Sequence, residues 1–138
     1  MTEPTFGRVG YKTPGGPPSR PEHLVDRFPA ERTQAMTAAG TLIRALLGQD
    51  ARTNDMVAKA IERFLETQPE WDESNGSIDM VYWHYATLAM RLVGGRTWPQ
   101  WSRGMQALCL RTQVAGSGGQ AGSWDPVDVW GEYGGRVY

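Results

Sequence analysis

The sequence lacks the features that define several large classes of protein. Cys109 is the only cysteine among 138 residues, so the chain cannot form an internal disulfide, which excludes a disulfide-stabilised scaffold. No apolar run reaches the roughly 20 residues that a membrane-spanning helix needs. The formal net charge is only −1, so there is no overall basic field to attract nucleic acid or an anionic membrane. Residues 1–30 also lack the apolar stretch of a signal peptide, and the cellular compartment therefore stays open.

The sequence does contain enough apolar residues to build a core. Hydrophobic residues make up 40% and charged residues 21%, which is the balance of an ordinary globular domain. Six tryptophans is a high count, and five of them fall after residue 80. Large aromatic residues gathered in one region predict either a bulky core or an aromatic-lined cavity. These five are Trp83, Trp98, Trp101, Trp124 and Trp130.

Proline and glycine divide the chain into two parts. Residues 1–30 hold six of the nine prolines and four glycines, a composition that does not pack as a helix. We therefore expect an extended or disordered N-terminal arm over residues 1–30, anchored by Phe6, Val9 and Tyr11. Residues 31–138 are expected to form a helical domain.

Two helices are predicted directly after the arm. The first is expected from about Ala30 to Leu47, because apolar positions recur there with helical spacing. These positions are Met36, Gly40, Ile43 and Leu47. A second helix should begin after Asn54, a favourable N-cap residue, and end near residue 68. Its predicted buried face consists of Val57, Ala60, Ile61, Phe64 and Leu65.

The sequence that follows predicts a second pair of helices. Ser77 is expected to cap a third helix that ends at Gly94–Gly95, with Asp79 in its first turn, where the helix dipole favours a carboxylate. This helix has two adjoining apolar stripes, which is typical of an element buried on several sides. They are Val81, Tyr85, Leu88, Leu92 and Tyr82, Ala86, Ala89, Val93. A fourth helix should run from about Thr97 to Gln113, with the face Met105, Leu108, Cys109 and Thr112.

The strongest signal is an internal repeat with a period near 45 residues. A Thr-Leu pair begins at Thr41, and after a gap of three residues come two aliphatic residues and a glycine. The same pattern recurs 46 residues later at Thr87. A Thr-Gln pair ends the second and the fourth helix, and a Trp-Asp pair follows each. This period is typical of stacked helical hairpins, predicted here over about 31–75 and 77–130. The alternative is a chance likeness between two amphipathic hairpins in a small bundle.

Several short motifs in the second half of the chain occur in a characteristic order. They are YWHYAT from Tyr82, GG at Gly94 with tryptophans after it, Gln113, GSWDP from Gly122 and GGRVY from Gly134. In these motifs the chain resembles bacterial prenyltransferase/squalene-cyclase repeat proteins, a group within the terpenoid cyclase and protein prenyltransferase family. The segment before Gly48 resembles the same group more faintly.

This resemblance implies an α/α-toroid, in which an inner and an outer ring of helices alternate along the chain. In such proteins a glutamine caps an outer helix and stacks on a tryptophan, which ties successive hairpins together. The matching residues are Gln68 and Trp71 in the first unit, and Gln113, Gly122 and Trp124 in the second. If Trp124 is a buried staple of this kind, its replacement by alanine should cost roughly 3–5 kcal/mol. A closed toroid needs more than two hairpins, so the resemblance implies a fragment, a short relative, or a subunit whose ring another chain completes.

The resemblance also raises two kinds of catalytic site. Cyclases that protonate their substrate use an Asp-x-Asp-Asp motif, which is absent here. The closest acidic pairs, Asp72 with Glu73 and Asp125 with Asp128, fall in predicted loops, where we expect solvated or capping groups. Prenyltransferases bind zinc through Asp, Cys and His, but the spacing of these residues matches no metal motif, so no metal or other cofactor is predicted. The residues available are Asp79, His84 and Cys109.

A ligand cavity is a further prediction for the second half. Its candidate residues are Tyr82, Trp83, His84, Trp124, Asp125 and Arg136. The aromatic rings would line a cavity for an apolar ligand such as a polyprenyl group, and the alternative is that they pack between hairpins. His84 would act on a ligand or else bond a neighbouring carbonyl. Arg136 would hold a phosphate or carboxylate, or else pair with Asp125 as a loop clamp.

The sequence favours a non-catalytic binding or protein-interaction module of the toroid type. An isoprenoid-binding or cyclase-like enzyme that is active only as a completed toroid is the second hypothesis, and a small helical adaptor is the third. The expected partner is a further copy of the chain or another protein that completes the ring, with an apolar ligand as the alternative. No nucleic acid and no membrane span are expected, and fold similarity alone decides none of these functions.

Overall fold

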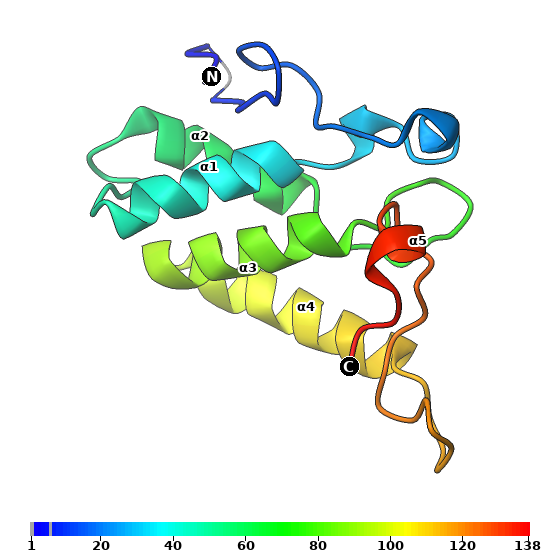
Figure 1. Cartoon of the computed structure of the whole chain (residues 1–138). Helices are drawn as coiled ribbons and strands as arrows, with labels where there is room; N and C mark the ends of the chain where they lie inside the picture. The colour runs from blue at the N-terminus through cyan, green and yellow to red at the C-terminus, as the bar shows by residue number, and fades with distance from the viewer. Residues whose placement is uncertain (1, 6) are drawn as a thin grey trace.

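The computed structural model describes residues 2–5 and 7–138, and this part of the chain is all-α (Figure 1). The four main helices are α1 (Ala35–Leu46), α2 (Asp55–Glu66), α3 (Met80–Val93) and α4 (Thr97–Thr112). Two 3₁₀ turns precede them, η1 (Glu22–Leu24) and η2 (Ala30–Arg32), and the one-turn helix α5 (Gly131–Gly134) follows them. The predicted all-α class is therefore confirmed. No helix in the described ranges is long and apolar enough to cross a membrane.

The helices form two hairpins, α1–α2 and α3–α4, that stack on each other. α1 lies along α3 in the most extensive helix–helix interface, and α2 contacts α4 (Figure 1). Each unit of the sequence repeat thus corresponds to one hairpin, and the two units stack first helix on first helix. The closed ring that the resemblance implies stays a prediction.

The core lies between the hairpins and follows the predicted faces of α2 and α3. Four of the five residues predicted to face inward from α2 are buried, and Leu65 is half-buried. Tyr82, Ala86 and Ala89 of α3 are buried as well, so this stripe is confirmed. Trp101 of α4 is fully buried, and its ring packs against other aromatic rings of the core. Those rings belong to Phe64 and Tyr82.

α1 begins later than predicted and buries a different face. The helix starts at Ala35 because the residues before it form η2, after which the backbone of Thr33 is extended. Ile43 is 58% and Leu47 is 73% exposed, so the predicted inner face was wrong. The small residue Ala38 is fully buried instead. Small side chains allow the backbones of α1 and α3 to approach closely, and this outweighs the larger apolar area of the other face.

The helix ends follow ordinary capping chemistry. Asn54 caps α2 as predicted, since its side-chain oxygen accepts hydrogen bonds from the backbone N–H groups of the first turn at 2.9 and 3.3 Å. Ser77 does not cap α3. Asp79 has that role, and its carboxylate accepts the N–H of Tyr82 at 2.9 Å. Gly94, with a φ of +67°, ends α3 as predicted.

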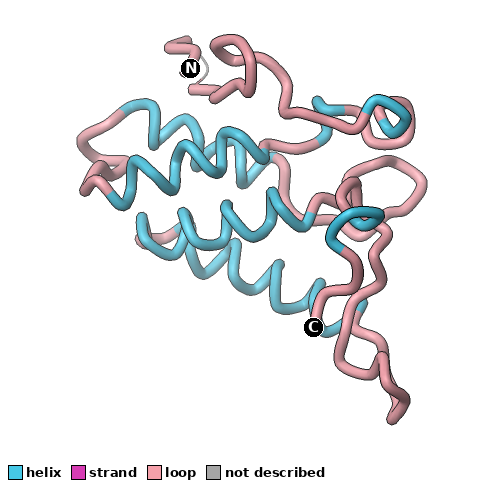
Figure 2. The backbone as a smooth tube through the Cα atoms, viewed as in Figure 1, coloured by secondary structure: helices cyan, strands magenta, loops and turns pink. Residues whose placement is uncertain are grey.

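The N-terminal arm lies across the outer side of α1 and α2 and is almost entirely loop (Figure 2). Val9 is an anchor, as predicted. Its N–H donates to Thr37 Oγ1 at 3.2 Å, and a Cβ added at Gly40 would come within 2.7 Å of its side chain. Tyr11 is exposed and does not anchor the arm. Phe6, the third predicted anchor, lies outside the described residues.

A second, smaller cluster holds the later part of the arm. Leu24 and Phe28 are buried together with Val129 of the C-terminal segment. The side chains of His23 and Glu132 also meet, at 2.9 Å, on the surface beside this cluster. The later part of the arm and the C-terminal segment are thus held together next to the start of α3.

Candidate functional site

One side of α3 is apolar and exposed. Four of its large apolar side chains have exposed fractions between 36% and 53%, and His84 lies among them. Exposed apolar residues at helical spacing usually mark a contact surface. We call this surface the open face of α3. It consists of Val81, His84, Tyr85, Leu88 and Leu92.

The internal repeat shows what covers the matching surface in the first unit. The offset of 46 residues pairs Ala38 of α1 with His84 of α3, and Leu42 with Leu88. Ala38 is fully buried in the core between the hairpins, and Leu42 packs against that core. His84 and Leu88 are exposed. The open face of α3 is therefore the surface on which another helical hairpin would stack.

A hollow of about 290 Å³ opens beside this face, between α3, α4 and the C-terminal segment. Trp71, Trp83 and Trp124 line it, and we call it the three-tryptophan pocket. His84 and Leu88 belong both to its wall and to the open face, so the two surfaces are continuous. The other lining residues are Met80, Thr87, Met105, Leu108, Cys109, Thr112 and Val137.

A second hollow of about 340 Å³ continues the open face toward the start of α3. It shares Met80, His84 and Val137 with the three-tryptophan pocket, so the two hollows form one groove along the helix. Trp130 lines this second hollow. Its indole N–H is buried and has no hydrogen-bond partner among the described residues.

The structure brings together three of the six predicted cavity residues. Trp83, His84 and Trp124 line the three-tryptophan pocket. Tyr82 does not, because its ring packs in the core and its hydroxyl donates to the carbonyl of Thr67 at 2.7 Å. Burial raises the pKa of Tyr82 well above the ordinary tyrosine value. This tyrosine is therefore a neutral core residue.

Asp125 and Arg136 also lie outside the pocket and bind each other. Their side chains form an ion pair, and Arg136 Nη1 donates to Ser123 Oγ at 3.0 Å. The backbones of Trp124 and Val137 form a β-bridge beside this pair. This geometry is that of the loop clamp considered for Arg136. The clamp fixes the segment that carries Trp124 to the pocket wall.

In the second unit the staple residues bond to one another or to α4, whereas in the first unit Gln68 and Trp71 have separate partners. Trp124 is half-buried, and its indole N–H donates to the carbonyl of Cys109 in the last turn of α4 at 3.1 Å. Gln113 Nε2 donates to the carbonyl of Gly122 at 2.7 Å. In the first unit Gln68 donates to Leu65 of its own helix, while Trp71 packs against Trp83 with ring centroids 6.1 Å apart. The two units therefore hold their tryptophans differently, although both rings reach the same pocket.

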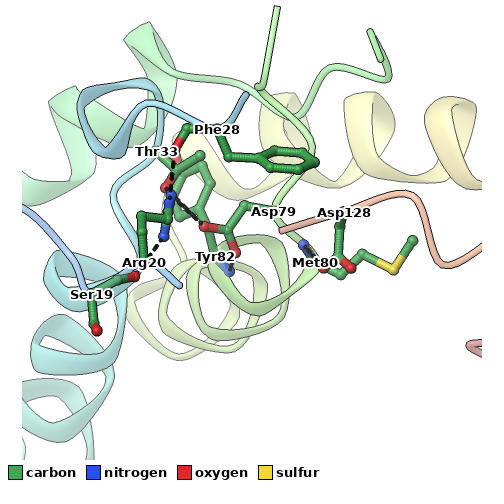
Figure 3. A network of polar contacts seen from close by, with 8 residues as sticks. All are labelled: Ser19, Arg20, Phe28, Thr33, Asp79, Met80, Tyr82 and Asp128. Atoms are coloured by element: carbon green, nitrogen blue, oxygen red, sulfur yellow. Dashed lines mark hydrogen bonds and ion pairs between the residues drawn. The ribbon is translucent and has the colours of Figure 1, made fainter. Parts of the chain in front are cut away.

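A buried polar junction at the start of α3 was not predicted (Figure 3). Arg20 Nη2 contacts Asp79 Oδ2 at 3.1 Å, and these side chains are only 3% and 0% exposed. Thr33 Oγ1 donates to the same carboxylate oxygen at 2.8 Å. Asp128 accepts the N–H of Met80 at 3.2 Å from the other side. Arg20 is one of several charged residues in the proline-rich arm, and no pattern in the sequence points to Asp79 as its buried partner.

The acidic pairs do not form a protonated acid inside the three-tryptophan pocket. Asp72 accepts hydrogen bonds from the hydroxyl and backbone N–H of Ser74, and these bonds hold its pKa below the ordinary value. Asp125 is exposed and bonded to Arg136. Burial raises the pKa of Asp128, and the charge of Asp79 nearby adds to this, but its carboxylate lies at the N-terminus of α3.

The three residues considered for zinc do not form a site. His84 and Cys109 line the same pocket, but Asp79 belongs to the junction with Arg20. No group of three or more His, Cys, Asp and Glu residues able to hold a metal occurs in the described ranges. Burial raises the pKa of Cys109, which disfavours the thiolate that a metal binds.

Comparisons with known proteins do not assign the chain to a family. No protein-family model, curated protein or solved structure matches it. The resemblance to prenyltransferase/squalene-cyclase repeat proteins stays a prediction. The features of the molecule that bear on function are therefore the open face of α3 and the pocket beside it.

Proposed function

We propose that this protein is a non-catalytic interaction module that binds a protein partner on the open face of α3. The observation that supports this most strongly is the exposure of His84 and Leu88, since the matching residues of α1 are the fully buried Ala38 and the half-buried Leu42. A helical hairpin in a stack buries one apolar face on the preceding unit and the other on the following unit. Here the second of these faces is uncovered.

The arm covers part of the opposite end of the stack, while Ile43 and Leu47 at the end of α1 stay exposed. The arm lies on the outer side of α1, where Val9 packs on Gly40 and Arg44 donates to Thr2 Oγ1 at 2.9 Å. Terminal units of helical repeats need such a cap because their outer face would otherwise remain apolar and exposed. At the α3 end, Trp124 and Val137 line the groove, while the side chains of the open face stay exposed. A partner at this end would complete the stack, as an additional hairpin does in the toroid that the resemblance implies.

The proposal can be tested by selection from a displayed library of helical peptides. Binders selected on the wild-type chain should lose affinity roughly 30-fold or more for Leu88→Arg, because a charge would be placed at the centre of the contact. Leu110→Arg is the matched control, since Leu110 is 77% exposed on α4 and lines neither hollow. Failure to select any binder, or equal binding to both variants, would refute the proposal.

A second candidate function is binding of an apolar small molecule in the three-tryptophan pocket. The observation that favours it is the meeting of Trp83, His84 and Trp124 on one hollow. The resemblance suggests a polyprenyl compound, and farnesol is a suitable probe. Saturable quenching of tryptophan fluorescence by farnesol, lost in Cys109→Trp but not in Leu110→Trp, would support this function. Quenching that does not saturate would rule it out.

A further inference from the structure

The second hairpin has a one-sided charge composition. Residues 80–124 contain four arginines and no aspartate or glutamate, which is a formal charge of +4. Since the whole chain has a net charge of −1, the remaining residues carry −5. Charge separated in this way produces a local positive field although the protein as a whole is nearly neutral. All four arginines are exposed, and no ion pair joins them to a carboxylate of the described residues.

Arg91 brings this charge to the edge of the open face. It precedes Leu92 and follows Leu88 by three positions, so it lies next to the apolar stripe on α3. Its guanidinium lies over the ring of Trp98, with 5.6 Å to the centroid. This contact holds the charge beside the groove while leaving its hydrogen-bond donors free for another partner.

We propose that the partner is an amphipathic helix of another protein with acidic residues flanking its apolar face. This inference rests on the proposed function and adds the chemistry of the partner. The helix would lie along the open face of α3, as α3 itself lies along α1, and would place one large apolar side chain in the three-tryptophan pocket. Helices bind apolar grooves in this way through residues at positions i, i+4 and i+7. Acidic residues flanking the apolar face of the partner helix would pair with Arg91, and the positive charge of the second hairpin would attract them.

A second copy of the chain fits the charges and the shape less well. Two open faces brought together would place two hairpins of formal charge +4 against each other. A head-to-tail stack would need the outer side of α1, where Val9 already packs on Gly40. An anionic membrane would match the charge, but much of the apolar surface lines the two hollows between α3, α4 and the C-terminal segment.

The flanking residues of the selected peptides provide the test. Acidic flanks are expected in the peptides whose binding depends on Leu88. One such peptide, synthesised and labelled, should bind Arg91→Glu about tenfold more weakly than the wild type, and added salt should weaken wild-type binding. Arg103→Glu makes the same change of charge on α4, away from both hollows, and should change binding less than about twofold. Replacing the largest apolar residue of the peptide by alanine should weaken binding roughly 30-fold.

The other outcomes separate this inference from the proposed function. Peptides that depend on Leu88 but carry neutral or basic flanks would overturn the acidic partner and leave the interaction module intact. If none of the selected peptides depends on Leu88 for binding, both the acidic partner and the interaction module are overturned. Self-association in analytical ultracentrifugation that Leu88→Arg abolishes would make a second copy the occupant. Binding to vesicles of phosphatidylcholine and phosphatidylserine in equal parts, lost in Leu88→Arg, would show that the open face of α3 binds a membrane.

Discussion

Replacement of Arg20 by methionine tests whether the arm is an integral part of the fold. Methionine keeps an unbranched apolar stem but removes the guanidinium, which contacts four groups. Nη2 binds Asp79 and Thr33 at 3.1 and 2.7 Å, and Nε donates to the carbonyl of Phe28 at 3.2 Å. Nη1 donates to the carbonyl of Ser19 at 3.1 Å. The substitution therefore leaves a fully buried carboxylate without its cation.

The expected cost follows from that unpaired charge. Removing one partner of a buried ion pair typically costs about 3–5 kcal/mol, because the remaining charge stays desolvated. Asp79→Asn in the Arg20→Met background should recover part of this loss, since an amide carries no charge and its oxygen can still accept the N–H of Tyr82. A coupling energy of about 2 kcal/mol between the two substitutions is expected.

Urea unfolding followed by tryptophan fluorescence measures these free energies for the wild type, the two single variants and the double variant. Arg52→Met is the control, because Arg52 pairs with Asp50 on the exposed surface and its loss should leave the midpoint unchanged. Digestion with a low amount of protease should also cut the arm of Arg20→Met sooner than that of the wild type. A loss below about 1 kcal/mol, with no coupling to Asp79, would show that the junction is solvated and the arm loosely held.

Three further predictions use the same unfolding assay. Trp101→Ala should cost about 3–5 kcal/mol because the ring is fully buried, whereas Trp124→Ala should cost only about 2 kcal/mol because this ring is half-buried; equal losses would contradict the difference in burial. Asn54→Ala should cost about 1 kcal/mol through loss of the α2 cap, and Asn54→Asp should retain most of that stability. Since burial raises the pKa of Asp128, the folded state holds a proton more tightly than the unfolded chain, so wild-type stability relative to Asp128→Asn should rise as the pH falls from neutrality toward about 4. A relative stability that falls over this range would show that the carboxylate is stabilised in its charged form.

Much of the helical organisation could be predicted because it depends on local interactions. Asn54 caps α2 through its own neighbours, and Gly94 ends α3 through its positive φ. The Thr-Leu repeat beginning at Thr41 and Thr87 predicts two equivalent helices, and those helices pack side by side. Each of these features involves residues within a turn of one another or a pattern that repeats along the chain.

The choice between apolar faces could not be predicted in the same way. α1 and α3 each present apolar residues on more than one side, and periodicity does not tell which side meets a neighbour. Ala38 is buried and Ile43 is exposed because α3 packs on the small residues of α1. For the same reason periodicity did not separate Tyr82, whose ring packs in the core, from His84, which lines the three-tryptophan pocket.

The all-α class, the four main helices and their pairing into two repeated units could be predicted without the structure, since backbone capping and hydrophobic spacing act over a few residues. Three features follow only from the folded chain, namely the ion pair of Arg20 with Asp79, the contact of the arm with α1, and the exposure of Leu88. These features join residues far apart in the chain, and their contacts depend on how closely two helices approach and on where a buried charge finds its partner. The positive charge of residues 80–124 could be counted in the sequence, but the position of Arg91 beside an apolar groove depends on the folded structure.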